Sequence, residues 1–183
     1  MKRAVFLDRD GTINRDVHHL SRVTELRLLP GAAEAIRVFN RLSLFVIVVT
    51  NQSAVGRGLL EEETLRDIHK TLMERLRCRD ARIDKIYYCP HHPEGTGKYQ
   101  LKCRCRKPAT GLVQRAVRQF QIDTRQSFMI GDTTTDIATG KKTGLTTILV
   151  RTGFGGKDGR CAAEPDFTVK NLKDAARLIR GLI

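Results

Sequence analysis

Two pairs of closely spaced carboxylates stand out in the sequence. Asp8 and Asp10 are separated by a single residue, and Asp132 and Asp136 by three. Carboxylates gathered at one place repel one another unless a cation is present, and ligands made only of oxygen favour a hard ion such as Mg²⁺. A Mg²⁺ ion held in this way suits phosphoryl transfer. The two pairs therefore predict a magnesium site for phosphate chemistry, provided that the fold brings them together.

Four side chains can be given roles in the hydrolysis of a phosphate ester. Asp8 is the candidate nucleophile, which would form an aspartyl-phosphate, and Asp10 is the candidate general acid and base. The Thr50 hydroxyl and the Lys107 ammonium would neutralise charge on the transferring phosphoryl group. We expect the Mg²⁺ ligands to be Asp8, Asp10 and Asp132. Asp136 is expected to contact these ligands rather than the ion.

A second group of metal-ligand residues lies in a loop rich in proline and basic side chains. A Cys-x-His pair is followed, after eleven residues, by a Cys-x-Cys pair. Three thiols and one imidazole match the closed tetrahedral site of structural Zn²⁺, although the spacing is not that of a Cys-x-x-Cys finger. The spacing predicts a zinc-bound loop over about residues 89–108. The candidate ligands are Cys89, Cys103, Cys105 and either His91 or His92.

The catalytic candidates stand directly after short apolar runs. Such runs, rich in β-branched or aromatic residues, are typical of strands that are buried on both faces. Segments with the apolar spacing of amphipathic helices alternate with them. The predicted strands are residues 4–7, 44–49, 86–88, 128–130 and 147–150, and the predicted helices are residues 32–42, 65–76, 112–120 and 171–182.

Strand–helix alternation predicts a parallel sheet covered by helices on both sides. We therefore expect an α/β fold, a three-layer α/β/α sandwich with a mainly parallel, Rossmann-like sheet, in one domain over residues 1–183. Ligands of such sheets bind beyond the carboxyl ends of the strands. Asp8, Thr50 and Asp132 should consequently meet at one edge.

Three connections between the predicted elements are long. Residues 9–30 and 89–110 are polar, and loops of this length inside a compact domain usually carry function. Residues 153–159 are rich in glycine but no helical pattern opens after them. A dinucleotide-binding loop needs that helix, so we expect a mobile loop without a ligand there.

Composition and charge indicate where the protein is located and which class of partner it binds. The chain has a formal net charge of +13, 40% hydrophobic residues and no tryptophan. Its longest apolar run is too short to cross a bilayer, and the N-terminus lacks a signal-peptide pattern, so we expect a cytoplasmic protein with no membrane partner. Residues 98–107 carry five cations and no acid beside the proposed phosphate site. This clustering favours a small anionic substrate over a specific nucleic acid, for which stacking aromatics are scarce.

Taken together, the motifs resemble the four motifs of the haloacid dehalogenase superfamily. In that superfamily the first Asp of D-x-D-G-T is the nucleophile and the second is the general acid and base. The zinc loop narrows the resemblance to heptose bisphosphate phosphatases, since the related histidinol-phosphate phosphatases have a shorter gap between the His and the second Cys pair. The matching segments are Asp8-Arg-Asp-Gly-Thr12, Thr50-Asn51-Gln52, Lys107 and Gly131-Asp132-x-x-x-Asp136.

The resemblance implies a magnesium-dependent phosphomonoesterase that removes the 7-phosphate of a heptose 1,7-bisphosphate, in the supply of activated heptose for cell-surface polysaccharide. It implies a zinc loop in place of a large cap domain, with His91 as the imidazole ligand, and a structural zinc that orders Arg106 and Lys107. We expect a monomer. The expected substrate contacts are Asp16, His18, His19, Asn51, Gln52, Ser53, Arg106 and Thr133.

Two departures from that family concern the substrate. Asp16-Val-His-His-Leu20 stands where the family usually has an aromatic Gly-Tyr element, and Thr133 stands where it commonly has Lys. Histidinol phosphate and a nucleic-acid 3′-phosphate therefore stay as alternative substrates. A zinc-stabilised nucleic-acid-binding module with degenerate motifs is the alternative from another class. The intact nucleophile and acid positions speak against it.

Overall fold

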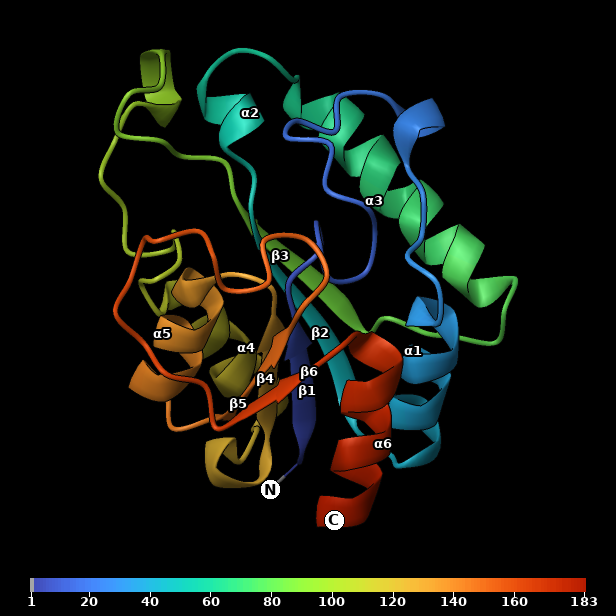
Figure 1. The fold of residues 1–183 in the computed structure, drawn as a ribbon. Coiled ribbons are helices and arrows are strands. Elements are labelled where there is room, and N and C mark those ends of the chain that lie inside the picture. Colours follow the sequence, from blue (N-terminus) through green and yellow to red (C-terminus); the bar gives the residue numbers. More distant parts are fainter. Residues whose placement is uncertain (1) are drawn as a thin grey trace.

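Six parallel strands form one sheet in the order β3-β2-β1-β4-β5-β6 (Figure 1). The computed structural model describes residues 2–183, so the predicted domain begins one residue before the described part, at Met1. The parallel α/β sheet expected from the sequence is confirmed. The strands are β1 (Ala4–Leu7), β2 (Phe45–Asn51), β3 (Lys85–Cys89), β4 (Phe128–Gly131), β5 (Thr146–Val150) and β6 (Phe167–Val169).

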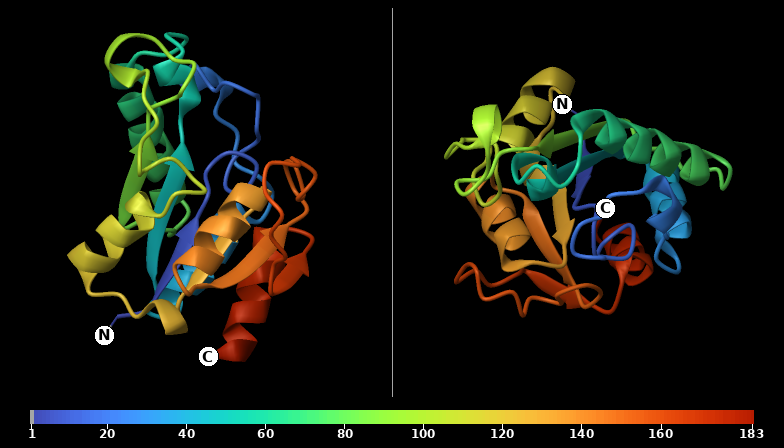
Figure 2. Two further views of the ribbon diagram at one scale, coloured as in Figure 1. Left: turned by 90° about the vertical axis from the view of Figure 1, so that its left-hand side faces the viewer. Right: turned by 90° about the horizontal axis from the view of Figure 1, so that it is seen from above.

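Helices cover both faces of the sheet, which gives the three predicted layers. Helices α1, α3 and α6 lie on one face, and α4 and α5 on the other (Figures 1 and 2). Within residues 2–183 no separate cap domain is inserted between these elements. The helices are α1 (Ala32–Arg41), α2 (Ser53–Gly56), α3 (Glu62–Arg77), α4 (Gly111–Phe120), α5 (Thr134–Lys142) and α6 (Leu172–Leu182).

Strand β1 shows why the apolar runs in the sequence are unbroken. Val5 and Leu7 pack into the core under α1, α3 and α6, whereas Ala4 and Phe6 pack into the core on the side of α4. All four side chains have no exposed surface. Burying a side chain such as Leu or Phe contributes about 1.5–3 kcal/mol. The central strand is therefore fixed from both faces, and so is the position of Asp8 that follows it.

Three of these helices and strands were not predicted from the sequence, namely the four-residue α2, α5 and β6. Helix α5 has no amphipathic pattern because Thr135 to Gly140 are buried on all sides, so the apolar stripe used to detect helices is missing. Its start is instead marked by a capping box between Thr133 and Asp136. Strand β6 is a three-residue edge strand with exposed side chains, which leaves no buried run to detect.

The long connections gather at one end of the sheet. In Figure 1 the loops after β1, β2 and β3 rise above the carboxyl ends of the strands, and both chain termini lie at the opposite end. The loop after β5 reaches the same region. Within residues 2–183 there is no helix that is both long and apolar enough to cross a membrane.

Candidate active site

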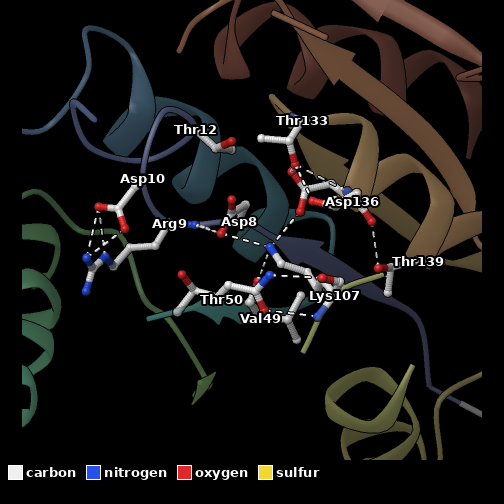
Figure 3. A network of polar contacts seen from close by, with 12 residues as sticks. Asp8, Arg9, Asp10, Thr12, Val49, Thr50, Lys107, Thr133, Asp136 and Thr139 are labelled. Atoms are coloured by element: carbon white, nitrogen blue, oxygen red, sulfur yellow. Dashed lines mark hydrogen bonds and ion pairs between the residues drawn. The ribbon is translucent and has the colours of Figure 1, made fainter. Parts of the chain in front are cut away.

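The ammonium of Lys107 lies between two carboxylates at the carboxyl ends of the strands (Figure 3). Its Nζ atom is 2.9 Å from Asp8 Oδ1 and 2.6 Å from Asp136 Oδ1, and it donates to the Val49 carbonyl at 2.8 Å. The residue is only 4% exposed. Burial alone would lower the pKa of Lys107, but Asp136 and Asp8 raise it above its ordinary value. Lys107 is therefore a permanent cation at the centre of the site.

Three carboxylates surround this ammonium. Asp8, Asp132 and Asp136 offer ligand atoms that all lie within 4.8 Å of one another. Burial raises the pKa of Asp8 to about 6 and that of Asp132 to about 8, and the neighbouring carboxylates push both in the same direction. When all three carboxylates are ionised, they and the ammonium leave two negative charges, which a divalent cation would balance. The oxygen-only donor set fits Mg²⁺.

Asp136 has less freedom to bind a metal than its two neighbours. Its Oδ1 atom is paired with Lys107, and its Oδ2 atom accepts from the backbone N–H and the hydroxyl of Thr133 at 3.1 and 2.6 Å. Asp8 differs, because Lys107 and the Arg9 N–H both contact its Oδ1 atom. Among residues 2–183, no hydrogen bond is made to Asp8 Oδ2. This oxygen is free for chemistry.

The carboxylate of Asp10 points away from this cluster, toward Arg9 (Figure 3). Arg9 contacts it through Nε and Nη2 at 2.7–3.1 Å, and the amides of Asn14 and Gln52 donate to it at 2.8 and 3.0 Å. Burial alone would raise the pKa of Asp10, but Arg9 and these hydrogen bonds lower it. The structure thus brings Asp8, Asp132 and Asp136 together and leaves the Asp10 carboxylate outside the group.

Arg9 and His69 form a buried pair that sequence reasoning missed. Arg9 has no exposed surface, and its Nη1 atom is 3.1 Å from His69 Nε2. Because the guanidinium can only donate, the imidazole nitrogen must accept. Burial and the charge of Arg9 lower the pKa of His69 to about 3. Nothing in the sequence indicates that an arginine between two aspartates is buried. His69 lies on an apolar helix face, where nothing marks it as a partner of Arg9.

The segment that ends β2 holds the catalytic side chains in place. The Asn51 amide group accepts from the Lys107 N–H at 3.0 Å and donates to the Lys107 carbonyl at 3.1 Å. The Gln52 amide donates to both Thr50 Oγ1 and Asp10 Oδ2. Asn51 therefore fixes the backbone of the lysine, and Gln52 links the two sides of the site.

A polar cleft opens above these groups, and most of the residues expected from the sequence line it. Gln52 and Asp136 are exceptions, since both are buried and do not line the cleft. The predicted residues on the cleft are Asp8, Asp10, Asp16, His18, His19, Thr50, Asn51, Ser53, Arg106, Lys107, Asp132 and Thr133. Three further residues were not predicted, namely Thr135, Phe154 and Arg160.

The loop after β5 is built around Asp132. The Phe154 N–H donates to Asp132 Oδ2 at 2.8 Å, and the Gly156 N–H donates to the Asp132 carbonyl at 2.8 Å. A methyl group on Gly153 would clash with Asp132 Oδ2. The loop that the sequence predicts to be mobile thus contacts Asp132, and glycine at position 153 permits this close approach to a carboxylate. The sequence signal was the glycine-rich run itself, but the sequence does not show that this run lies against Asp132.

The three thiols and the imidazole at the end of β3 lie close together. Their sulfur–sulfur distances are 3.0–3.4 Å, and His91 Nδ1 is 3.3 Å from Cys105 Sγ. Ligands of a tetrahedral zinc with bonds of about 2.3 Å are separated by slightly more than this, whereas a disulfide is far shorter. The donor set fits Zn²⁺. His92 lies outside the group, against Arg57.

This group is continuous with the cleft. The Arg106 N–H donates to Cys103 Sγ at 3.3 Å, and the Arg106 side chain extends over the His91 carbonyl and into the cleft. Lys107 follows directly. The four ligand-type residues therefore determine where both basic side chains stand.

Comparison with known proteins agrees with this geometry. Residues 104–175 match the HAD-hydrolase-like family model. The D-glycero-beta-D-manno-heptose-1,7-bisphosphate 7-phosphatase of Pasteurella multocida (strain Pm70) is 36% identical over 184 residues, covering 100% of this chain and 99% of its own. The enzyme of that name from Escherichia coli (strain K12) is 37% identical, over 82% of this chain and 80% of its own. The chain belongs to the heptose bisphosphate phosphatase family.

A solved structure of that family shares the fold. The D,D-heptose 1,7-bisphosphate phosphatase from B. bronchiseptica, complexed with magnesium and phosphate, has a TM-score of 0.89 and 30% identity, with 100% of both chains covered. The resemblance of the sequence to heptose bisphosphate phosphatases is thereby confirmed, as is the assignment of the chain to the phosphatases.

The Gly153 contact predicts a loss of activity that a matched glycine avoids. Gly153 and Gly159 both have positive φ, 57° and 63°, but nothing lies within 4 Å of a methyl group on Gly159. Both alanine substitutions should lower stability by about 1 kcal/mol through backbone strain. Only Gly153→Ala should also displace Asp132, and lower kcat by about 100-fold or more. Equal kcat values for the two variants, measured by phosphate release, would contradict this.

The buried imidazole predicts a pH-dependent stability. His69 stays neutral in the fold down to about pH 3 but takes up a proton in the unfolded chain below about pH 6.5. The free energy of unfolding should therefore fall with decreasing pH in this window, by up to about 1.4 kcal/mol per pH unit from this group.

His69→Gln keeps an acceptor for Arg9 and removes the titration, so its denaturation midpoint should decline less steeply between pH 6.5 and 4.5. The exposed His19 supplies the control, because His19→Gln removes an imidazole and leaves the buried network intact. An unchanged slope in His69→Gln is the result that would refute the assignment.

Proposed function

We propose that this chain hydrolyses the 7-phosphate of D-glycero-D-manno-heptose 1,7-bisphosphate through an aspartyl-phosphate on Asp8. The observation that carries the proposal is the geometry of Asp8. One carboxylate oxygen is held by the buried Lys107 ammonium and the Arg9 N–H, while the other faces the cleft without a hydrogen bond in the described chain. Membership of the heptose bisphosphate phosphatase family supplies the substrate.

Asp8 Oδ2 would attack phosphorus and displace the sugar oxygen. Lys107 and the Thr50 hydroxyl would stabilise the negative charge on the transferring oxygens, because both border the same cleft. Mg²⁺, held by Asp8 and Asp132, would supply further charge neutralisation and orient the phosphate. Asp136 would keep Lys107 in place.

Asp10 would protonate the leaving oxygen and later activate water. This requires its carboxylate to turn from Arg9 toward the cleft that it lines. In the orientation seen here, Arg9 and the hydrogen bonds keep the pKa of Asp10 low, so the carboxylate is ionised. Turning away from Arg9 would raise this pKa toward the range that a general acid and base needs. The predicted role of Asp10 as a metal ligand has no support from its side chain, which lies outside the cluster.

We also propose that Cys89, His91, Cys103 and Cys105 bind a structural Zn²⁺. Four protein ligands leave no open position, so the ion would hold the loop rather than activate water. Unpaired thiols at these positions fit a reducing compartment, in agreement with the predicted cytoplasmic location. A monomeric state and the lack of a specific nucleic-acid partner stay predictions.

The substrate assignment is tested by comparing phosphate release from heptose 1,7-bisphosphate anomers, histidinol phosphate and a 3′-phosphorylated oligonucleotide, each with and without Mg²⁺. We expect a clear preference for a heptose bisphosphate and a loss of turnover without Mg²⁺. Asp8→Asn should lower kcat by about 1,000-fold or more because the nucleophile is removed. Asp67→Asn, on the exposed side of α3, should have no effect. Preference for histidinol phosphate, or retained turnover in Asp8→Asn, would overturn the proposal.

Replacing one thiol tests the zinc site. Cys103→Ser should lower the zinc content and raise KM more than it lowers kcat, because Arg106 is displaced while Asn51 still holds the Lys107 backbone. Cys78→Ser removes an exposed thiol and should change neither. Metal analysis and steady-state kinetics give both readouts. Full zinc content in Cys103→Ser would show that Cys103 is not a zinc ligand.

A further inference from the structure

Two arginines from distant parts of the chain border the cleft without a carboxylate partner. Arg106 follows the cysteine cluster, and Arg160 belongs to the loop after β5. In the described part of the chain neither side chain forms an ion pair. Lys107, by contrast, is shared between Asp8 and Asp136. The positive charge available for a second anionic group therefore resides on the two arginines.

The position of Arg160 is fixed on both sides. Asp158 accepts from the backbone N–H and the hydroxyl of Thr134 at 2.7 and 2.8 Å, and the Cys161 N–H donates to the same hydroxyl at 3.0 Å. The Arg160 guanidinium carbon lies 5.2 Å from the centre of the Phe154 ring. Stacking on an aromatic face restrains a guanidinium and leaves its N–H edge free for an anion.

A bisphosphate substrate needs a site for the phosphate that is not hydrolysed. The reacting phosphate would occupy the region of Asp8, Thr50 and Lys107, where the ammonium is already neutralised by carboxylates. A guanidinium can donate two parallel hydrogen bonds to phosphate, which gives both affinity and orientation. An exposed arginine held at the rim of the cleft is suited to the distal end of a substrate that reaches in from solvent.

We propose that Arg160, stacked on Phe154, binds the second phosphate of the substrate together with Arg106 and so selects doubly over singly phosphorylated sugars. This inference rests on the proposed function and adds a specificity-determining residue to it. Thr133, which also lines the cleft, cannot supply this charge, because its side chain is neutral, and its hydroxyl is engaged with Asp136.

Steady-state kinetics with two substrates that differ by one phosphate test the inference. Heptose 1,7-bisphosphate and heptose 7-phosphate share the reacting group. Arg160→Ala should raise KM for the bisphosphate by about 10- to 100-fold, the range of a charge-assisted contact, and leave kcat and the KM for the monophosphate within about twofold. Arg160→Lys should recover part of the loss, because it restores charge but not the fork.

Arg151→Ala is the matched control. It removes the same charge from the same loop at an exposed position outside the cleft, and should leave the preference for the bisphosphate unchanged. Equal losses on both substrates in Arg160→Ala would indicate a structural role and overturn the inference, as would unchanged kinetics on both.

A second substrate pair separates this inference from the proposed function. If the wild-type protein turns over fructose 1,6-bisphosphate in preference to the heptose compound, the proposed substrate is wrong. The inference still holds if Arg160→Ala then loses discrimination against fructose 6-phosphate. If the wild-type protein prefers heptose 1,7-bisphosphate over the fructose compound, and Arg160→Ala still discriminates as strongly against heptose 7-phosphate, the proposed function stands and the inference fails.

Discussion

The ammonium of Lys107 lies between Asp8 and Asp136 with almost no access to water. A charge in such a place is costly unless it is paired and hydrogen-bonded, and here two carboxylates and the Val49 carbonyl meet that requirement. The same contacts hold one oxygen of Asp8 and leave the other free. Removing Lys107 would leave like charges facing one another, so this ion triad decides both the stability and the reactivity of the site.

The surrounding structure can be understood as support for this triad. Strand β1 is buried on both faces and fixes Asp8, Asn51 at the end of β2 brackets the Lys107 backbone, and the capping box of α5 fixes Asp136. The cysteine cluster sets the approach of the chain to Lys107 from the other side. The loop after β5 encloses Asp132 and brings a further cation to the rim. The same loops thus hold the catalytic residues in place and carry the residues proposed to select the substrate.

The sequence predicted five of the six strands and most helices, because these leave a local pattern, and motifs and the family resemblance supplied most of the residues that line the cleft. Apolar runs mark strands, and Asp8, Thr50 and Asp132 follow such runs directly. Long-range contacts leave no local pattern in the sequence. The burial of Arg9 against His69 depends on two segments sixty residues apart, and the side-chain direction of Asp10 depends on that burial. Helix α5 was not predicted because it is buried on all sides. Arg160 was not predicted as a cleft residue because the contact between its loop and Asp132 is long-range.

Trapping the covalent intermediate tests the central claim most directly. The Asp10→Asn variant, incubated with Mg²⁺ and heptose 1,7-bisphosphate, should form the aspartyl-phosphate more slowly, because the leaving oxygen is no longer protonated, and should then retain it, because water is no longer activated. After acid quenching and proteolysis, mass spectrometry should find one phosphoryl group on Asp8, and hydroxylamine should remove it. A phosphoryl group on another residue, or continued phosphate release with an unmodified Asp8, would contradict the account.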